Sequence, residues 1–138
     1  MSNIFAAIGN VQLNRFKEFS AKRRELARIY DKQFKNCNKI FPINRNYQEV
    51  VPHIYVVRLA SNINRDEIRL KLLKLDIEIG FHYYPNHKLT FYKTEKALPE
   101  TEKIYKNLIS LPLHTKLKSK HIKIVSKALI DLVECINE

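Results

Sequence analysis

The sequence predicts an α/β fold of the two-layer α+β kind, in which a small three-stranded sheet is packed with helices and preceded by one long N-terminal helix. Apolar residues recur every three or four positions up to about residue 34, and β-branched and aromatic runs near 53–59 and 77–83 alternate with further helical patterns. The 138 residues suffice for one domain with its own core. We therefore expect a single domain, with residues 1–36 as the long helix and residues 53–138 as the α/β part.

The long helix is predicted to begin at about Ile4, with Ser2 or Asn3 as its N-cap. Its apolar positions form one helical face: Ile4, Ile8, Val11, Phe16, Phe19, Leu26, Ile29, Tyr30 and Phe34. A helix of about 30 residues is roughly 45 Å long, more than so small a domain needs to cover its own core. Part of it is therefore expected to pack against another chain or domain. The basic run Lys22-Arg23-Arg24 is interpreted as solvated surface.

Residues 36–52 are predicted to form an irregular connection, with room for a short extended piece. The β-branched and aromatic run from His53 to Leu59 predicts a central strand. A helix then follows to about Lys74, with Asn64 as its cap and Glu67 as the partner in a capping box.

The second predicted strand, residues 77–83, carries the candidate functional residues. Alternation directs one set of side chains toward the core: Ile77, Ile79, Phe81 and Tyr83. The other set would look into a cleft: Glu78, Gly80, His82 and Tyr84. Pro85 cannot donate a ladder hydrogen bond and should end the pairing. Just past the strand end we expect four polar or aromatic side chains to gather: His82, Tyr83, Tyr84 and His87.

The rest of the chain is predicted to be a loop, a helix, a strand and a final helix. The loop covers residues 85–98, and the helix from Pro99 reaches about Leu108. Residues 109–113 form a short strand that Pro112 restricts to an edge or a terminal position. Ser119 is expected to cap the last helix, which ends near Cys135.

Composition limits the classes of function. Two glycines, Gly9 and Gly80, are too few for a phosphate-binding glycine-rich loop. Cys37 and Cys135 form no CxxC pair, which favours a reduced, cytoplasmic protein. No long uncharged apolar run or signal-peptide pattern occurs, so no membrane span is expected. The net charge of +11 is spread along the chain, and no nucleic-acid-binding motif occurs. We therefore interpret the charge as a lysine-rich solvated surface and do not expect a nucleic-acid partner.

Several stretches, in order and spacing, resemble the C-terminal part of the DegT/DnrJ/EryC1/StrS family of PLP-dependent nucleotide-sugar aminotransferases. The resemblance covers essentially the whole chain and rests on the following residues: Met1–Leu13, Arg23-Arg24, Tyr30, His53-Ile-Tyr-Val-Val-Arg58, Arg65-Asp-Glu67, Ile79-Gly-Phe-His-Tyr-Tyr-Pro-Asn-His87, Leu98-Pro99, Glu102 and Ser110-Leu-Pro-Leu113.

The resemblance implies the C-terminal small domain of a fold-type-I aminotransferase. In the family, the large N-terminal domain supplies the Schiff-base lysine, the acidic partner of the pyridine nitrogen and most phosphate contacts. We therefore expect a severed small domain that binds no cofactor and performs no transamination alone, although the complete enzyme would use PLP and a nucleotide-linked keto-sugar. The expected partner is a second copy or a separately encoded N-terminal PLP-binding half.

The resemblance also places His82, Tyr84 and His87 near the sugar-nucleotide side of the cleft in a complete enzyme. For the isolated chain, packing or surface roles are the preferred interpretation of these residues. His53, His114 and His121 receive only a structural interpretation. Two alternative functions stay open, a basic nucleic-acid-binding module and a self-associating interaction module.

Overall fold

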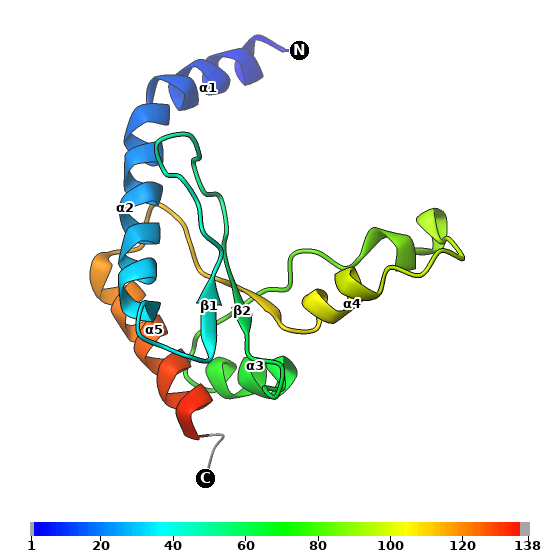
Figure 1. The fold of residues 1–138 in the computed structure, drawn as a ribbon. Helices are drawn as coiled ribbons and strands as arrows, with labels where there is room; N and C mark the ends of the chain where they lie inside the picture. Colours follow the sequence, from blue (N-terminus) through cyan, green and yellow to red (C-terminus); the bar gives the residue numbers. More distant parts are fainter. Residues whose placement is uncertain (1, 136–138) are drawn as a thin grey trace.

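The computed structural model describes residues 2–135 of the chain (Figure 1). This part contains five α-helices and a three-stranded antiparallel sheet. The helices are α1 (Asn3–Asn14), α2 (Phe16–Phe34), α3 (Arg65–Leu73), α4 (Pro99–Tyr105) and α5 (Ser119–Glu134). The strands are β1 (Ile40–Pro42), β2 (Tyr55–Leu59) and β3 (Leu108–Leu111). Two 3-10 turns, Asn86–Lys88 and Thr90–Tyr92, lie between α3 and α4. The predicted α+β class is confirmed.

The sheet has the order β1-β2-β3, with β2 in the centre as its β-branched run predicts. Val57 of β2 pairs with Pro42 on one side and Ile109 on the other. Helices α2 and α5 pack against each other and bury their apolar faces in one core with the sheet. Within this core the ring of Tyr30 stacks on that of Tyr55 at a centroid distance of 4.5 Å.

The prediction of a strand over residues 77–83 is wrong. Only Gly80 pairs, with Ser110 of β3, through reciprocal backbone hydrogen bonds of 3.0 and 2.8 Å. This antiparallel register would next pair Glu78 with Pro112, which has no N–H to donate, so the ladder cannot extend on that side. Past Gly80 the alternation of burial also stops, because Phe81 is half-buried and Tyr83 is exposed.

The third strand of the sheet is instead β1, which lies inside the predicted irregular connection. Ile40 is buried and pairs with Leu59 of β2. Three residues are too short to show a period of two, so the sequence pattern left room for an extended piece here but did not identify a sheet strand.

The single long helix of the prediction is two helices that meet at an angle at Arg15 (Figure 1). Arg15 has a ψ of −3°, which opens the helical ladder. The Arg15 guanidinium lies 3.6 Å from the carboxylate of Glu18 and over the ring of Phe19. Neither proline nor glycine marks the bend, so apolar spacing alone extends the helix through it. Helix α2 packs into the core, whereas α1 buries none of its residues.

The predicted caps are confirmed at Ser2, which accepts from a first-turn amide of α1, and at Asn64, which accepts from two amides of α3. The prediction of Ser119 as the last cap is wrong by one residue. Lys118 is the N-cap of α5, and its backbone N–H donates to Nδ1 of His121 at 3.2 Å.

The interpretation of the basic run in α2 as solvated surface is wrong for two of its residues. Nη1 of Arg23 donates to the carbonyl of His53 at 2.8 Å, and Nε of Arg24 donates to that of Val50 at 3.2 Å. Both arginines therefore attach the segment before β2 to α2, and part of the positive charge serves the fold.

Candidate functional site

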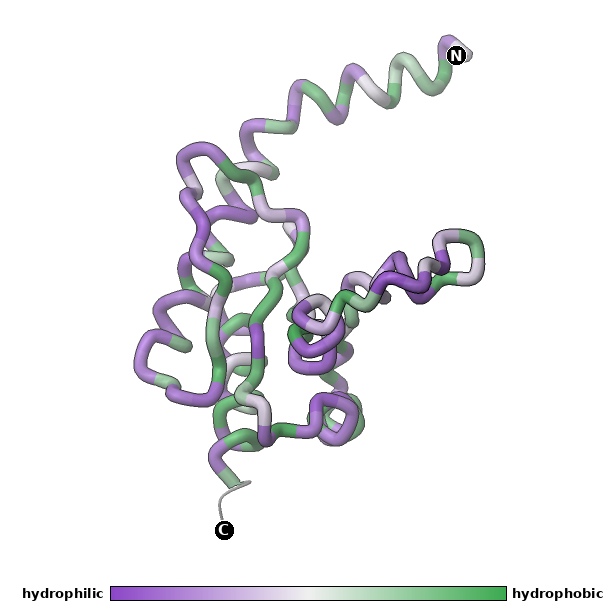
Figure 2. Tube along the Cα trace, turned by 45° about the vertical axis from the view of Figure 1, so that its right-hand side comes forward, coloured by the Kyte–Doolittle hydropathy of each residue, from purple (hydrophilic) through white to green (hydrophobic). Residues whose placement is uncertain are grey.

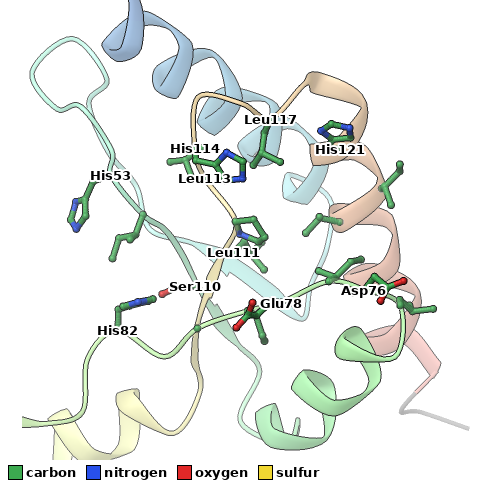
Figure 3. A pocket seen from close by; sticks show the side chains of 18 residues that line it. His53, Asp76, Glu78, His82, Ser110, Leu111, Leu113, His114, Leu117 and His121 are labelled. Atoms are coloured by element: carbon green, nitrogen blue, oxygen red, sulfur yellow. The ribbon is translucent and has the colours of Figure 1, made fainter. Parts of the chain in front are cut away.

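A surface hollow of about 770 Å³ lies between the chain after α3, the end of β3 and the first turns of α5 (Figure 3). Four of the five histidines line it: His53, His82, His114 and His121. The apolar part of its wall is formed mainly by Leu75, Ile77, Ile79, Leu111, Leu113, Leu117, Ile124 and Val125. The hollow therefore combines an apolar wall with several groups that donate and accept hydrogen bonds.

The ring of His82 lies over Gly80. A Cβ at Gly80 would overlap this ring, so the glycine makes room for the imidazole. Residues paired across an antiparallel ladder share a face of the sheet, which places Ser110 on the same side as the ring. Figure 3 shows the His82 side chain directed toward Ser110.

Ser110 is 4% exposed, and its Oγ has no hydrogen-bond partner among the described residues. A buried hydroxyl without a partner costs free energy. The wall of the hollow thus holds a buried hydroxyl without a partner, Ser110 Oγ, beside the exposed imidazole of His82.

The charged side chains in the wall are carboxylates, Asp76 and Glu78; among the described residues neither lysine nor arginine lines the hollow. Within residues 2–135 no three His, Cys, Asp or Glu side chains are grouped to hold a metal ion. The polar groups of the hollow are therefore imidazoles, a hydroxyl and two carboxylates, which donate and accept hydrogen bonds.

Tyr84 and His87 do not join His82, so the expected gathering past the strand end is not observed. His82 contacts the ring of Tyr83 edge-on at a centroid distance of 5.0 Å. Tyr84 contacts the ring of Tyr105 in α4 edge-on at 5.6 Å. His87 is half-buried, and its Nε2 lies 3.1 Å from Oε1 of Glu102 in α4. The segment crosses to α4 instead of folding back on itself.

The Glu102 carboxylate joins the two sides of this crossing. The hydrogen bond from the Lys88 ammonium, followed by that from His87, lowers the pKa of the Glu102 carboxyl. The same Glu102 contact raises the pKa of Lys88. His87 and Lys88 thus attach the start of residues 86–98, which we call the arm, to α4, and His87 has its Nε2 committed to that contact.

Arg65 fixes the base of the arm. Its guanidinium lies between the rings of Phe81 and Tyr105, with Cζ 4.2 and 4.1 Å from the ring centres. It also donates to the carbonyls of Tyr105 and Leu108. Arg65 thus contacts the residue directly before His82, which lines the hollow.

The sequence interpretation missed four residues of the hollow: His53, Ser110, His114 and His121. They come from segments up to 68 positions apart, and no spacing signal joins them. Ser110 could have been noticed as a polar residue within an apolar strand run.

Comparison with known proteins gives the context of this geometry. A Saccharopolyspora spinosa dTDP-4-dehydro-2,3,6-trideoxy-D-glucose 4-aminotransferase is 31% identical over 135 residues, which cover 96% of this chain and 35% of that protein. A Campylobacter jejuni UDP-4-amino-4,6-dideoxy-N-acetyl-beta-L-altrosamine transaminase is 28% identical, over 100% of this chain and 38% of that protein.

Solved structures agree with the sequence relatives. The PLP form of a Streptococcus pneumoniae protein assigned as a sugar aminotransferase superposes with a TM-score of 0.88 and 30% identity, covering 99% of this chain and 36% of that one. The aminotransferase TlmJ of Streptoalloteichus hindustanus gives 0.83 and 27%, over 95% and 36% of the two chains. The chain spans little more than a third of the length of these relatives.

None of the helices in the described part of the chain is long and apolar enough to cross a membrane. The sequence pattern of the DegT/DnrJ/EryC1/StrS aminotransferase family matches residues 1–130. The fold, the relatives and this match agree, and the chain belongs to that family.

Proposed function

We propose that residues 1–138 are the C-terminal small domain of a PLP-dependent aminotransferase that transfers an amino group to a nucleotide-linked keto-sugar. In this proposal the chain forms one domain that shapes the sugar side of the active site, and the lysine that reacts with PLP lies outside these residues. The observation that carries it is the hollow, which offers imidazole and hydroxyl groups but, within the described residues, no amine.

The residues that line the hollow do not fit PLP itself. The cofactor needs an amine for its covalent bond and positive groups for its phosphate. Neither group lines the hollow among the described residues, and two of the lysines make other contacts, since Lys88 contacts Glu102 and Lys39 donates to the carbonyl of Val133 at 2.8 Å. We therefore propose that the chain alone binds no cofactor and transfers no amino group.

The three candidate residues have different proposed roles. His82, directed into the hollow beside Ser110, would donate to or accept from a sugar hydroxyl. Tyr84 keeps about half of its surface exposed and would present its hydroxyl on the same segment. His87 would act through Glu102 by holding the arm. The free thiols of Cys37 and Cys135 fit the reducing cytoplasm that we propose as the location.

A chimera tests the proposal. Residues 1–138 replace the matched segment of the S. pneumoniae relative, and amino transfer to a nucleotide-linked keto-sugar is measured with PLP present. We expect activity in the chimera and none in the 138-residue chain alone. An inactive chimera that binds PLP through its N-terminal part, next to an active parent enzyme, would contradict the proposal.

Two substitutions in the chimera test the sugar side. His82→Gln should raise KM about tenfold, the effect of losing a hydrogen bond of about 1.4 kcal/mol to the substrate. His114→Gln is the matched control, because Figure 3 shows His114 beside Leu113, apart from His82 and Ser110. We expect its KM to change less than about twofold. Equal KM values for the two variants would show that His82 does not have the proposed role in binding the sugar.

A further inference from the structure

Helix α1 has an apolar surface that the rest of the described chain does not cover. Its large side chains are all more than half exposed: Ile4, Phe5, Ile8, Val11 and Leu13. From Asn3 to Asn14 the helix contains no charged residue, although charged residues make up 28% of the chain. A helix of this composition is typically buried.

The apolar surface extends around most of the helix. At about 100° per residue, Ile4 and Leu13 point in opposite directions, and they are 72% and 71% exposed. The asparagines Asn3, Asn10 and Asn14 fall together in one narrow stripe of about 40°. Outside this stripe the circumference is apolar or small except at Gln12, which is polar but uncharged, so a single flat contact would leave much of the apolar surface in water.

Gly9 lies on the same broad surface, between the directions of Phe5 and Leu13. A glycine inside a helix costs about 1 kcal/mol relative to alanine. Nothing described lies within 4 Å of where its Cβ would be. The domain itself therefore gives no reason for a glycine there, whereas a backbone packed closely against α1 would.

Helix α1 also projects from the domain on the same side as the arm, in both views (Figures 1 and 2). Phe91, in the arm, is 89% exposed. A globular partner seated on α1 would thus lie on the side to which the arm reaches.

We propose that α1 is enclosed in an apolar trough of the part of an aminotransferase that this chain does not include. This rests on the proposed function and deepens it by naming the surface that joins the two parts. The relatives are nearly three times as long as the chain, so each contains a large region outside the match that can form such a trough.

A second copy of this chain fits the surface less well. Two paired helices cover only the facing side of each, which cannot enclose Ile4 and Leu13 together. Twelve residues of helix are about 18 Å long, which is short for the roughly 800 Å² per partner that a stable interface buries.

The test is co-expression of the full 138-residue chain with the region of the S. pneumoniae relative that precedes its matched segment, followed by sedimentation of the purified proteins at increasing concentration. Three variants place glutamine on α1: Ile8→Gln and Leu13→Gln on the apolar surface, about 140° apart, and Asn10→Gln on the asparagine stripe. We expect the first two each to weaken the complex about tenfold or more, and Asn10→Gln to change the Kd less than about twofold.

Because α1 is uncharged, the Kd should also stay nearly constant between low and high salt. Absence of a complex, or equal affinities of all variants, would overturn the inference. Sensitivity to Ile8→Gln but not to Leu13→Gln would indicate a one-sided contact and contradict the trough. Self-association of the chain alone that Ile8→Gln abolishes would assign the surface to a second copy. If the chimera is active but the Kd of the complex does not change with these substitutions, the inference about α1 is contradicted and the proposed function is not.

Discussion

Replacing Arg65 by alanine should destabilise the domain more than any comparable change on α3. The side chain is 11% exposed and touches two rings, and its guanidinium also donates to two backbone carbonyls. Each desolvated cation–ring contact contributes about 1 kcal/mol, and hydrogen bonds from a charged donor contribute about 1.5 kcal/mol or more. Some of this is offset by the cost of desolvating the cation, so we expect a loss of about 3 kcal/mol.

Arg65→Lys separates charge from shape. Lysine keeps the positive charge but cannot stack as a plane between Phe81 and Tyr105. The loss should then be about 1.5 kcal/mol. Arg69→Ala is the matched control, because Arg69 lies on the same helix, is exposed, and reaches only the Phe81 ring, at 5.7 Å. Its removal should cost about 0.5 kcal/mol or less.

Urea unfolding of the 138-residue chain, followed by far-UV circular dichroism, measures these differences. The m-value should stay constant if only the folded state is changed. A loss for Arg65→Ala within about 0.5 kcal/mol of that for Arg69→Ala would refute a stabilising role for the contacts of Arg65 with Phe81 and Tyr105.

Three further changes test separate parts of the structure. Asp76 has a left-handed φ of 58° after α3, so Asp76→Gly should raise the free energy of unfolding by about 0.5 kcal/mol, and a loss in urea unfolding would contradict this. Burial raises the pKa of Tyr30 above its usual 10, so the unfolded chain loses this proton at a lower pH than the folded chain, and the free energy of unfolding falls as pH rises above 10. Tyr30→Phe should make this decrease with pH less steep. An unchanged pH dependence of the free energy of unfolding would refute the role of Tyr30. Gly80→Ala should displace the His82 ring with a stability loss under about 1 kcal/mol, because the ring is exposed; unchanged His82 imidazole resonances in NMR spectra would show that the ring does not lie there.

The elements that repeat a pattern over many residues could be predicted from the sequence. Strand β2 has a dense β-branched run, and α5 keeps its apolar spacing over four turns. Asn64 caps α3 because its side chain competes well for first-turn amides. These are local preferences that the folded chain does not override.

The missed features depend on contacts between distant segments. The bend at Arg15 carries no glycine or proline, and β1 is only three residues long. The pairing of residues 77–83 fails because its register meets Pro112, a position that strand alternation does not consider.

The candidate site was predicted in part. His82 was identified on its segment, but its partners in the hollow come from the chain before β2, from β3 and from α5. Tyr84 and His87 were identified with it, although their contacts are with α4. Alternation along one strand could suggest which side chains face outward, but not which other segments they meet.

The position of the amine that reacts with PLP tests most directly whether the reactive lysine lies outside residues 1–138. The chimera is incubated with PLP, reduced with borohydride, digested and analysed by mass spectrometry for pyridoxyl-lysine. We predict one stoichiometric modified lysine in the N-terminal part and none within residues 1–138. A stoichiometric pyridoxyl group on any single lysine of residues 1–138, accompanied by amino transfer, would contradict the account.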